Sequence, residues 1–297
     1  MTRDHRRQWR SCLYVYPVIA RRSKGLSIGV NLNPDKRCTF SCVYCQIDRR
    51  AARDLHTVDL AVLRDELCLA MEEATTGRLW EEKRFAPTPP ELRRINDIAF
   101  SGDGEPTCLG EFHQAVRIAA EVKRKFGRGE VKIVVITNAT QLQSPQVRRA
   151  LPVLDANNGE IWAKLDAGTE EYFRKINRPN PPVTLASIVR NIVAVARDSP
   201  VVIQTLLFKT DGRPPPPEEL DAYCARLREI LDAGGKIKLV QLHTIARPPA
   251  EGSAIALGDG DLDALADRIR ASLPELNVEA YYGTPYQPPM AIGGEQY

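Results

Sequence analysis

The sequence predicts an α/β fold, in which an open parallel sheet curves into a partial (β/α)6 barrel with its helices outside. The 297-residue chain is 43% hydrophobic, which is typical of a globular protein. Short β-rich apolar runs alternate with longer amphipathic stretches, as in proteins built on parallel sheets. Six such units are too few for a closed eight-stranded barrel, and a doubly wound sheet is the alternative.

Each strand is predicted from a short apolar run, and each helix from apolar residues that recur at intervals of three and four, such as Leu60, Leu63 and Leu67. The predicted strands are Leu26–Leu32, Asp97–Ser101, Val131–Thr137, Glu160–Asp166, Val201–Phe208 and Lys236–His243, with Asn277–Tyr282 as a closing or edge strand. The predicted helices are Asp59–Thr75, Glu111–Phe126, Ser144–Leu151, Thr184–Arg197, Pro217–Ala233 and Gly260–Leu273.

The chain is expected to form one core domain, residues 26–283, between a basic N-terminal extension (1–25) and an extended C-terminal tail (284–297). The apolar patch Leu13–Ala20 is short, is broken by Pro17 and runs into basic residues, so it does not resemble a cleaved signal. No apolar stretch approaches the roughly 20 residues that cross a bilayer. We therefore expect a cytoplasmic protein without a membrane partner.

Positive charge is concentrated near the start of the chain. The formal net charge is +3, yet residues 1–53 carry twelve Lys or Arg against three Asp, a local charge of +9 that leaves −6 for the remainder. Such asymmetry suits a polyanionic partner such as RNA, and a solvated basic arm without a partner explains it equally well.

Three of the seven cysteines, Cys38, Cys42 and Cys45, follow the first predicted strand on a compact loop. Clustered thiolates select soft metals, which points to an iron–sulfur cluster, zinc or Cu(I). Zinc would need a fourth ligand, for which His56 is available. A 4Fe–4S cluster ordinarily takes four cysteines, and the next one, Cys68, lies on a predicted helix. Three ligands would leave one iron open, as a catalytic centre requires.

A glycine-rich turn follows the second predicted strand. Glycines allow close backbone approach and positive φ, and a carboxylate there can accept a charge-assisted hydrogen bond from an ammonium group. The residues concerned are Gly102, Asp103, Gly104 and Glu105.

Polar side chains also end or interrupt later strands. Thr137 and Asn138 close the third strand, and Gln204 interrupts the apolar fifth. Strand alternation places Lys164 and Asp166 on the same face of the fourth strand, toward the barrel interior. Because buried charges are costly unless they are paired, these two residues are either functional or a structural ion pair. Further candidates are Gln241 and His243 for the cavity, and Arg178 and Arg247 for an anionic group.

The Cys-x3-Cys-x2-Cys spacing, with Tyr44 before the last cysteine, resembles the radical S-adenosylmethionine (SAM) enzymes. The resemblance covers residues 26–283 and implies that the cysteine triad holds a 4Fe–4S cluster whose fourth iron binds SAM. Reductive cleavage of SAM would yield a 5′-deoxyadenosyl radical that takes hydrogen from the substrate. It also implies that Tyr44 lies near the adenine, and that the Gly104–Glu105 turn holds the SAM ammonium.

Shared stretches make the branch that contains tRNA 4-demethylwyosine synthase the most similar one, and they include Cys-Val-Tyr-Cys-Gln and Gly-Glu-Pro-Thr. That branch carries a second cluster built from upstream cysteines, whereas only Cys12 lies upstream here. The resemblance implies an oxidoreductase or transferase, a flavodoxin- or ferredoxin-type electron donor, and tRNA as one candidate substrate. The alternatives are a glycyl-radical-activating enzyme that modifies a protein, and a non-enzymatic iron–sulfur electron-transfer or zinc module.

Overall fold

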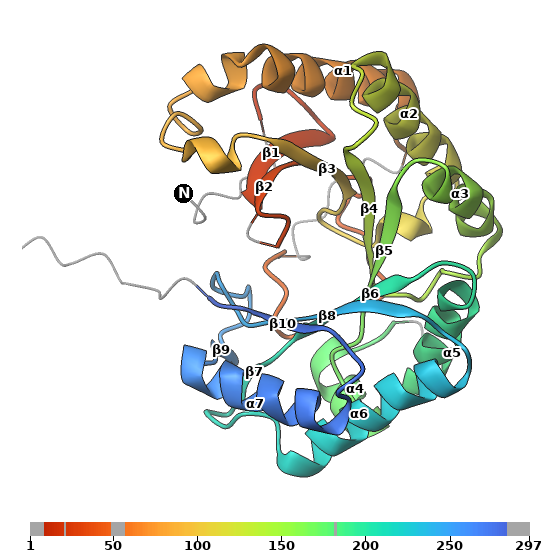
Figure 1. Ribbon diagram of the computed structural model, residues 1–297, viewed down its shortest axis with the longest axis vertical. Helices are drawn as coiled ribbons and strands as arrows, with labels where there is room; N and C mark the ends of the chain where they lie inside the picture. The colour runs from red at the N-terminus through yellow and green to blue at the C-terminus, as the bar shows by residue number, and fades with distance from the viewer. Residues whose placement is uncertain (1–8, 21, 49–56, 181–182, 284–297) are drawn as a thin grey trace, which may run out of the picture.

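The computed structural model describes residues 9–20, 22–48, 57–180 and 183–283. Within them, eight strands form one curved sheet in the order β1-β2-β3-β4-β5-β6-β8-β10, and the helices lie along its convex side (Figure 1). Strand β1 pairs antiparallel with β2, and every other neighbouring pair is parallel. The predicted open half-barrel is confirmed, because a doubly wound sheet would carry helices on both faces.

The elements follow the predicted alternation of strand and helix. The strands are β1 (Val15–Ala20), β2 (Gly25–Val30), β3 (Ile95–Phe100), β4 (Lys132–Thr137), β5 (Gly159–Lys164), β6 (Val201–Leu206), β8 (Ile237–His243) and β10 (Val278–Tyr281). The helices are α1 (Leu60–Thr76), α2 (Phe112–Lys125), α3 (Pro145–Asp155), α4 (Glu170–Asn177), α5 (Leu185–Ala196), α6 (Pro217–Asp232) and α7 (Asp259–Ser272). A small antiparallel sheet joins β7 (Phe208–Thr210) to β9 (Ala254–Ala256).

Besides the short strands β7 and β9, two larger elements were not predicted, β1 and α4. Residues 15–20, placed in the N-terminal extension, form the edge strand β1, where Pro17 is tolerated because an edge strand does not need every backbone donor. Helix α4 was not predicted, because its eight residues form little more than two turns, although Phe173, Ile176 and Asn177 lie at helical spacing on its buried face. The predicted tail 284–297 and residues 1–8 of the extension lie outside the described residues.

The hydrophobic core lies between the sheet and the outer helices. Its fully buried side chains include Leu63 and Leu67 of α1 and Phe112 of α2. A second, smaller cluster lies on the concave face and consists of Ala99, Val134, Trp162 and Val202. Because this inner cluster occupies only the middle of the concave face, polar side chains line the barrel interior above and below it.

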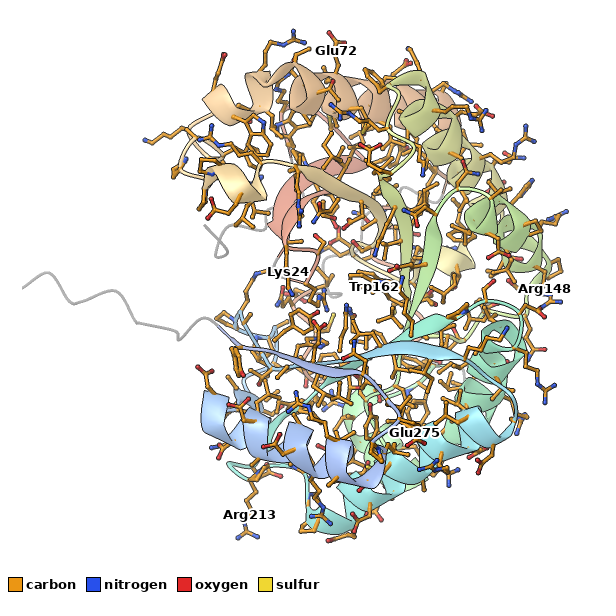
Figure 2. The ribbon with its side chains drawn as sticks, in the orientation of Figure 1. Lys24, Glu72, Arg148, Trp162, Arg213 and Glu275 are labelled. Carbon is orange, nitrogen blue, oxygen red and sulfur yellow. The ribbon has the colours of Figure 1, made fainter. Side chains whose placement is uncertain are left out.

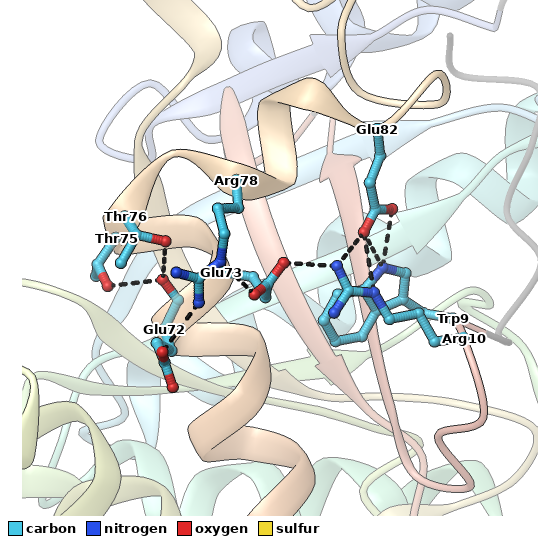
Figure 3. A network of polar contacts seen from close by, with 8 residues as sticks. All are labelled: Trp9, Arg10, Glu72, Glu73, Thr75, Thr76, Arg78 and Glu82. Atoms are coloured by element: carbon cyan, nitrogen blue, oxygen red, sulfur yellow. Dashed lines mark hydrogen bonds and ion pairs between the residues drawn. The ribbon is translucent and has the colours of Figure 1, made fainter.

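Buried and half-buried carboxylates attach the start of the described chain to α1 and to the segment that follows it (Figure 3). The Arg10 guanidinium pairs with Glu73 at 2.5 Å and with Glu82 at 2.8 Å, and the indole of Trp9 donates to Glu82. Glu66 of α1 accepts hydrogen bonds from three successive backbone N–H groups, at residues 13, 14 and 15. These contacts hold β1 against α1. None of the described helices has the length and apolar character needed to span a bilayer.

Candidate active site

A cavity of about 340 Å³ opens at the carboxyl ends of the strands, where parallel α/β folds place their active sites. All three thiols of the predicted triad line it, and Cys68 on α1 does not. The predicted residues that join the thiols on the wall are Tyr44, Gly102, Gly104, Glu105, Asn138, Lys164 and Gln204. His56, the possible zinc ligand, lies outside the described residues.

The cysteine loop is held between two elements that are distant in sequence. On one side, the backbone N–H of Glu105 donates to the carbonyl of Arg37 at 3.1 Å. On the other, the N–H groups of Ser41 and Val43 donate to carbonyls at the end of α4, with the Val43 bond to Ile176 at 2.9 Å. The ring of Phe40 packs edge-on against Phe173 of α4. Helix α4 therefore positions the cysteines.

The thiols receive N–H donors of the kind that surround iron–sulfur clusters and tune them. The Cys38 sulfur lies 3.5 Å from the N–H of Phe40 and 3.7 Å from the amide of Asn138. The amide of Asn177 lies 3.5 Å from the Cys42 sulfur, and burial raises the pKa of that thiol. In the described ranges, no three His, Cys, Asp or Glu side chains are arranged to hold a metal ion. The fit to a cluster therefore rests on the chemistry and surroundings of the thiols.

Glu105 is a buried carboxylate on the cavity wall, 2% exposed. It accepts from the Thr137 hydroxyl at 2.7 Å, from the backbone N–H of Asn138 at 2.7 Å, and from both donors of Thr107. Burial raises its pKa, although these hydrogen bonds oppose the rise. No described Lys or Arg forms an ion pair with it, so a cationic ligand such as an ammonium group would supply the missing charge.

Of the two reasons predicted for the glycines of this turn, close backbone approach is found and positive φ is not. Neither Gly102 nor Gly104 has a positive φ. A Cβ on Gly104 would lie 1.7 Å from the carbonyl oxygen of Arg37, and one on Gly102 would lie 2.3 Å from Oδ1 of Asn31. The small residues therefore allow the cysteine-bearing loop to pack directly against the turn.

Tyr44, Lys164, Asp166 and Asn177 form one hydrogen-bonded group behind the cysteines. The Tyr44 hydroxyl donates to Asp166 and accepts from Lys164 and Asn177, each at 3.0 Å. The Lys164 ammonium lies 3.6 Å from the Asp166 carboxylate and 4.6 Å from the centre of the Tyr44 ring. Burial lowers the pKa of Lys164, but the nearby carboxylate of Asp166 produces a net rise. Lys164 thus remains a cation on the cavity wall.

Of the two candidates named for the cavity, His243 lines it, and Gln241 lies behind Gln204, from which it accepts a hydrogen bond at 3.2 Å. Thr137, Asp103 and Asp166 do not line the cavity and contact its walls from behind. Asp103, for example, accepts from Asn31 at 2.9 Å.

The two arginines proposed for an anionic group differ. The Arg178 guanidinium pairs with Glu251 at 2.8 Å at the surface, whereas Arg247 lines the cavity and donates to Gln46.

Two site residues were missed by sequence reasoning. Asn177 contacts the Cys42 sulfur, Tyr44 and Asp166, and it was not among the predicted site residues. Asp97 lies 3% exposed on the concave face of β3, lines the cavity and accepts a hydrogen bond from Ser27. A carboxylate in a predicted apolar strand was the available signal.

The curved sheet, the outer helices and the thiols at the carboxyl ends define the fold of the radical SAM enzymes. Solved structures confirm this likeness. A radical SAM methyltransferase from Sphaerobacter thermophilus matches with a TM-score of 0.60 and 12% identity, over 87% of this chain and 66% of the other. SuiB from Streptococcus suis, bound to S-adenosylmethionine, matches with a TM-score of 0.56 and 14% identity, over 88% of this chain and 52% of SuiB. TYW1 with a lysine–pyruvate adduct matches with a TM-score of 0.51 and 14% identity, over 84% of this chain and 74% of TYW1. At these identities the fold is what is shared.

Sequence relatives are more limited in coverage, and no protein-family model matches the chain. A UPF0026 protein of Methanocaldococcus jannaschii is 30% identical over 178 residues, 60% of this chain and 48% of the relative. A protein of Brachyspira hyodysenteriae named GTPase Obg is 25% identical over 253 residues, 83% of this chain and 32% of the relative. A UPF0026 protein of Synechocystis is 28% identical over 201 residues, which are 66% of this chain and 64% of the relative. The chain therefore spans between 32% and 64% of the relatives' lengths.

Proposed function

We propose that this protein is a radical SAM enzyme, in which Cys38, Cys42 and Cys45 hold a 4Fe–4S cluster. The observation that carries the proposal is the meeting of these thiols with the buried carboxylate of Glu105 on one cavity wall, at the carboxyl ends of a radical SAM fold. When bound and reduced, the cluster supplies the electron that cleaves SAM and starts hydrogen abstraction from the substrate.

The protein's own residues bind and orient. Glu105 accepts the SAM ammonium, with its carboxylate held in position by Thr107, Thr137 and Asn138. The amide of Asn177 and the N–H of Phe40 donate to cysteine sulfurs and favour their thiolate form. The buried walls exclude water from the reacting groups.

The finer parts of the proposal concern partners. The electron donor is a low-potential protein of the flavodoxin or ferredoxin type. A tRNA base is the candidate substrate, supported by the positive charge of residues 1–53 and by the likeness of the fold to TYW1.

Anaerobic reconstitution with iron and sulfide tests this function. The reduced protein should convert SAM to methionine and 5′-deoxyadenosine, measured by liquid chromatography. Cys38→Ala, Cys42→Ala and Cys45→Ala should each abolish the nucleoside product. Cys224→Ala, in a buried cysteine of α6 outside the cavity, should retain it. Cleavage at the wild-type rate in any triad variant would refute the assignment.

A further inference from the structure

The half-barrel contains a second cavity, of about 670 Å³, at the amino ends of the strands. Side chains that line both cavities make them parts of one interior, and these are Arg22, Ser23, Asp97, Trp162 and Tyr281. Figure 2 shows Trp162 within the curve of the sheet and Lys24 beside the opening between the two edges of the sheet. A ligand in the amino-end cavity therefore has a path toward the cysteines past the Trp162 side chain.

Basic side chains from separate segments converge on this amino-end cavity. They come from the β1–β2 turn, the segment before β3, the segment after α2, and strands β4 and β8. With Arg22, which both cavities share, they are Lys24, Arg93, Arg94, Arg128, Lys132 and Lys238.

The acidic side chains of the wall do not balance this charge. Glu160 is a single carboxylate between two ammonium groups, 2.7 Å from Lys132 and 2.6 Å from Lys238. Burial raises the pKa of Asp97 to about 6, so this carboxylate is mostly ionised near neutral pH and adds one negative charge to the wall. The remaining carboxylates, Glu130 and Glu279, make only long contacts with basic groups, at 3.6 and 3.9 Å.

Arg94 is the clearest free cation of the cavity. Its side chain is exposed, and it forms no ion pair within the part of the chain that the structure describes. A concave surface with excess positive charge concentrates anions, and a guanidinium matches a phosphate with two parallel hydrogen bonds.

We propose that the amino-end cavity binds the phosphate groups of the substrate and holds them while the reacting part extends toward Glu105 and the cysteines. Only the identification of the ligand as the substrate rests on the proposed function. Phosphate binding at this place does not, because it needs neither cluster nor SAM. The phosphate could belong to a small phosphorylated molecule or to an RNA backbone.

The test uses the full-length, cluster-free protein and inorganic pyrophosphate, titrated calorimetrically at low ionic strength. Pyrophosphate should bind the wild type, and Arg94→Gln should weaken its affinity about tenfold, as expected for one charge-assisted contact. Arg148→Gln is the matched control, because Arg148 is an exposed arginine on the outer helix α3, outside both cavities (Figure 2). Its affinity should equal that of the wild type.

A second titration with a short single-stranded RNA separates the two sources. A loss in Arg94→Gln for pyrophosphate alone supports a small phosphorylated molecule, and a loss that extends to RNA supports a backbone contact. The proposal is overturned if neither probe binds the wild type, or if the Arg94 and Arg148 variants behave alike with both.

SAM cleavage by reconstituted protein is measured separately. Arg148→Gln, a change outside both cavities, should make 5′-deoxyadenosine at the wild-type rate without added substrate. If the wild type binds pyrophosphate but cleaves no SAM, the radical function fails while the phosphate site stands.

Discussion

Glu105 accepts hydrogen bonds through both carboxylate oxygens, and its charge has no basic partner among the described residues. Glu105→Gln should therefore weaken SAM binding by about 10- to 100-fold, the loss of a charged hydrogen bond. Because burial raises the pKa of Glu105, acidification should weaken SAM binding as the carboxylate takes up its proton. Equilibrium dialysis of reconstituted protein measures both effects. Glu111→Gln, an exposed carboxylate beyond the same turn and outside the cavity lining, should keep wild-type affinity, and equal affinities for all three proteins would contradict the role of Glu105.

Asp97 links the two cavities and carries a testable pH dependence. Burial raises its pKa from 3.8 to about 6, so the folded protein binds this proton more tightly than the unfolded chain does. Its contribution to stability therefore falls as the pH rises from about 4 to 6, and stays low above that range. Asp97→Asn should raise the free energy of unfolding at pH 8 by up to about 3 kcal/mol.

Urea titrations of both proteins at pH 4 and pH 8 measure this effect. The gain should disappear near pH 4, where the wild-type carboxyl is protonated. A gain that is equal at both pH values would show that proton binding is not its cause.

The cysteine loop is an element whose position depends on its neighbours. It packs against the Gly104 turn and the end of α4, so a methyl group between loop and turn should displace it. Gly104→Ala should lower the free energy of unfolding by about 1–3 kcal/mol, the usual effect of overpacking. It should also reduce the iron retained after reconstitution, measured colorimetrically.

Gly110→Ala is the matched control for this prediction. It lies just beyond the same turn, and its added Cβ would meet nothing within 4 Å. Iron contents that are equal in the two variants would show that the loop does not depend on this contact.

Strand β1 is one of the two edge strands of the sheet, and Glu66 attaches the chain at its start to α1. Glu66→Ala would leave three backbone N–H groups without their acceptor, which should lower the free energy of unfolding by on the order of 3 kcal/mol. Asp65→Ala changes an exposed neighbour on the same helix and should leave stability nearly unchanged. Chemical denaturation of both variants measures the free energy of unfolding. If both variants lost similar amounts, the change in helix propensity would explain the loss and the three hydrogen bonds would not.

The half-barrel as a molecule separates two kinds of chemistry. Thiols and Glu105 lie at the carboxyl ends of the strands, and basic side chains lie at the amino ends. The inner cluster around Trp162 lies between them. The concentration of positive charge seen in residues 1–53 includes Arg22 and Lys24 of the amino-end cavity, whereas Arg10 is already paired with Glu73 and Glu82. Only part of that charge is therefore available to an anionic ligand.

Most strands and helices could be predicted because their signals are local. Apolar spacing revealed α1 and the parallel strands, since a buried face imposes its period on consecutive residues. The same reasoning failed for β1 and α4. Strand β1 contains Pro17, which argues against a strand, and α4 has only eight residues, little more than two helical turns. The contacts of α4 with the distant cysteine loop lie in no short window of the sequence, whereas the partner of β1 is the adjacent strand β2.

By itself, the sequence determined the fold class, the spacing of the cysteine triad and the Gly-Glu-Pro turn, because these depend on residues that are adjacent in the chain. Only the tertiary structure decided which groups surround them. The amide of Asn177 reaches the Cys42 sulfur across 135 positions, and Thr137 reaches Glu105 across 32. The amino-end cavity likewise draws on the starts of several strands. Such groups meet because parallel strands bring equivalent ends together, and spacing along the chain does not record which side chains then face one another.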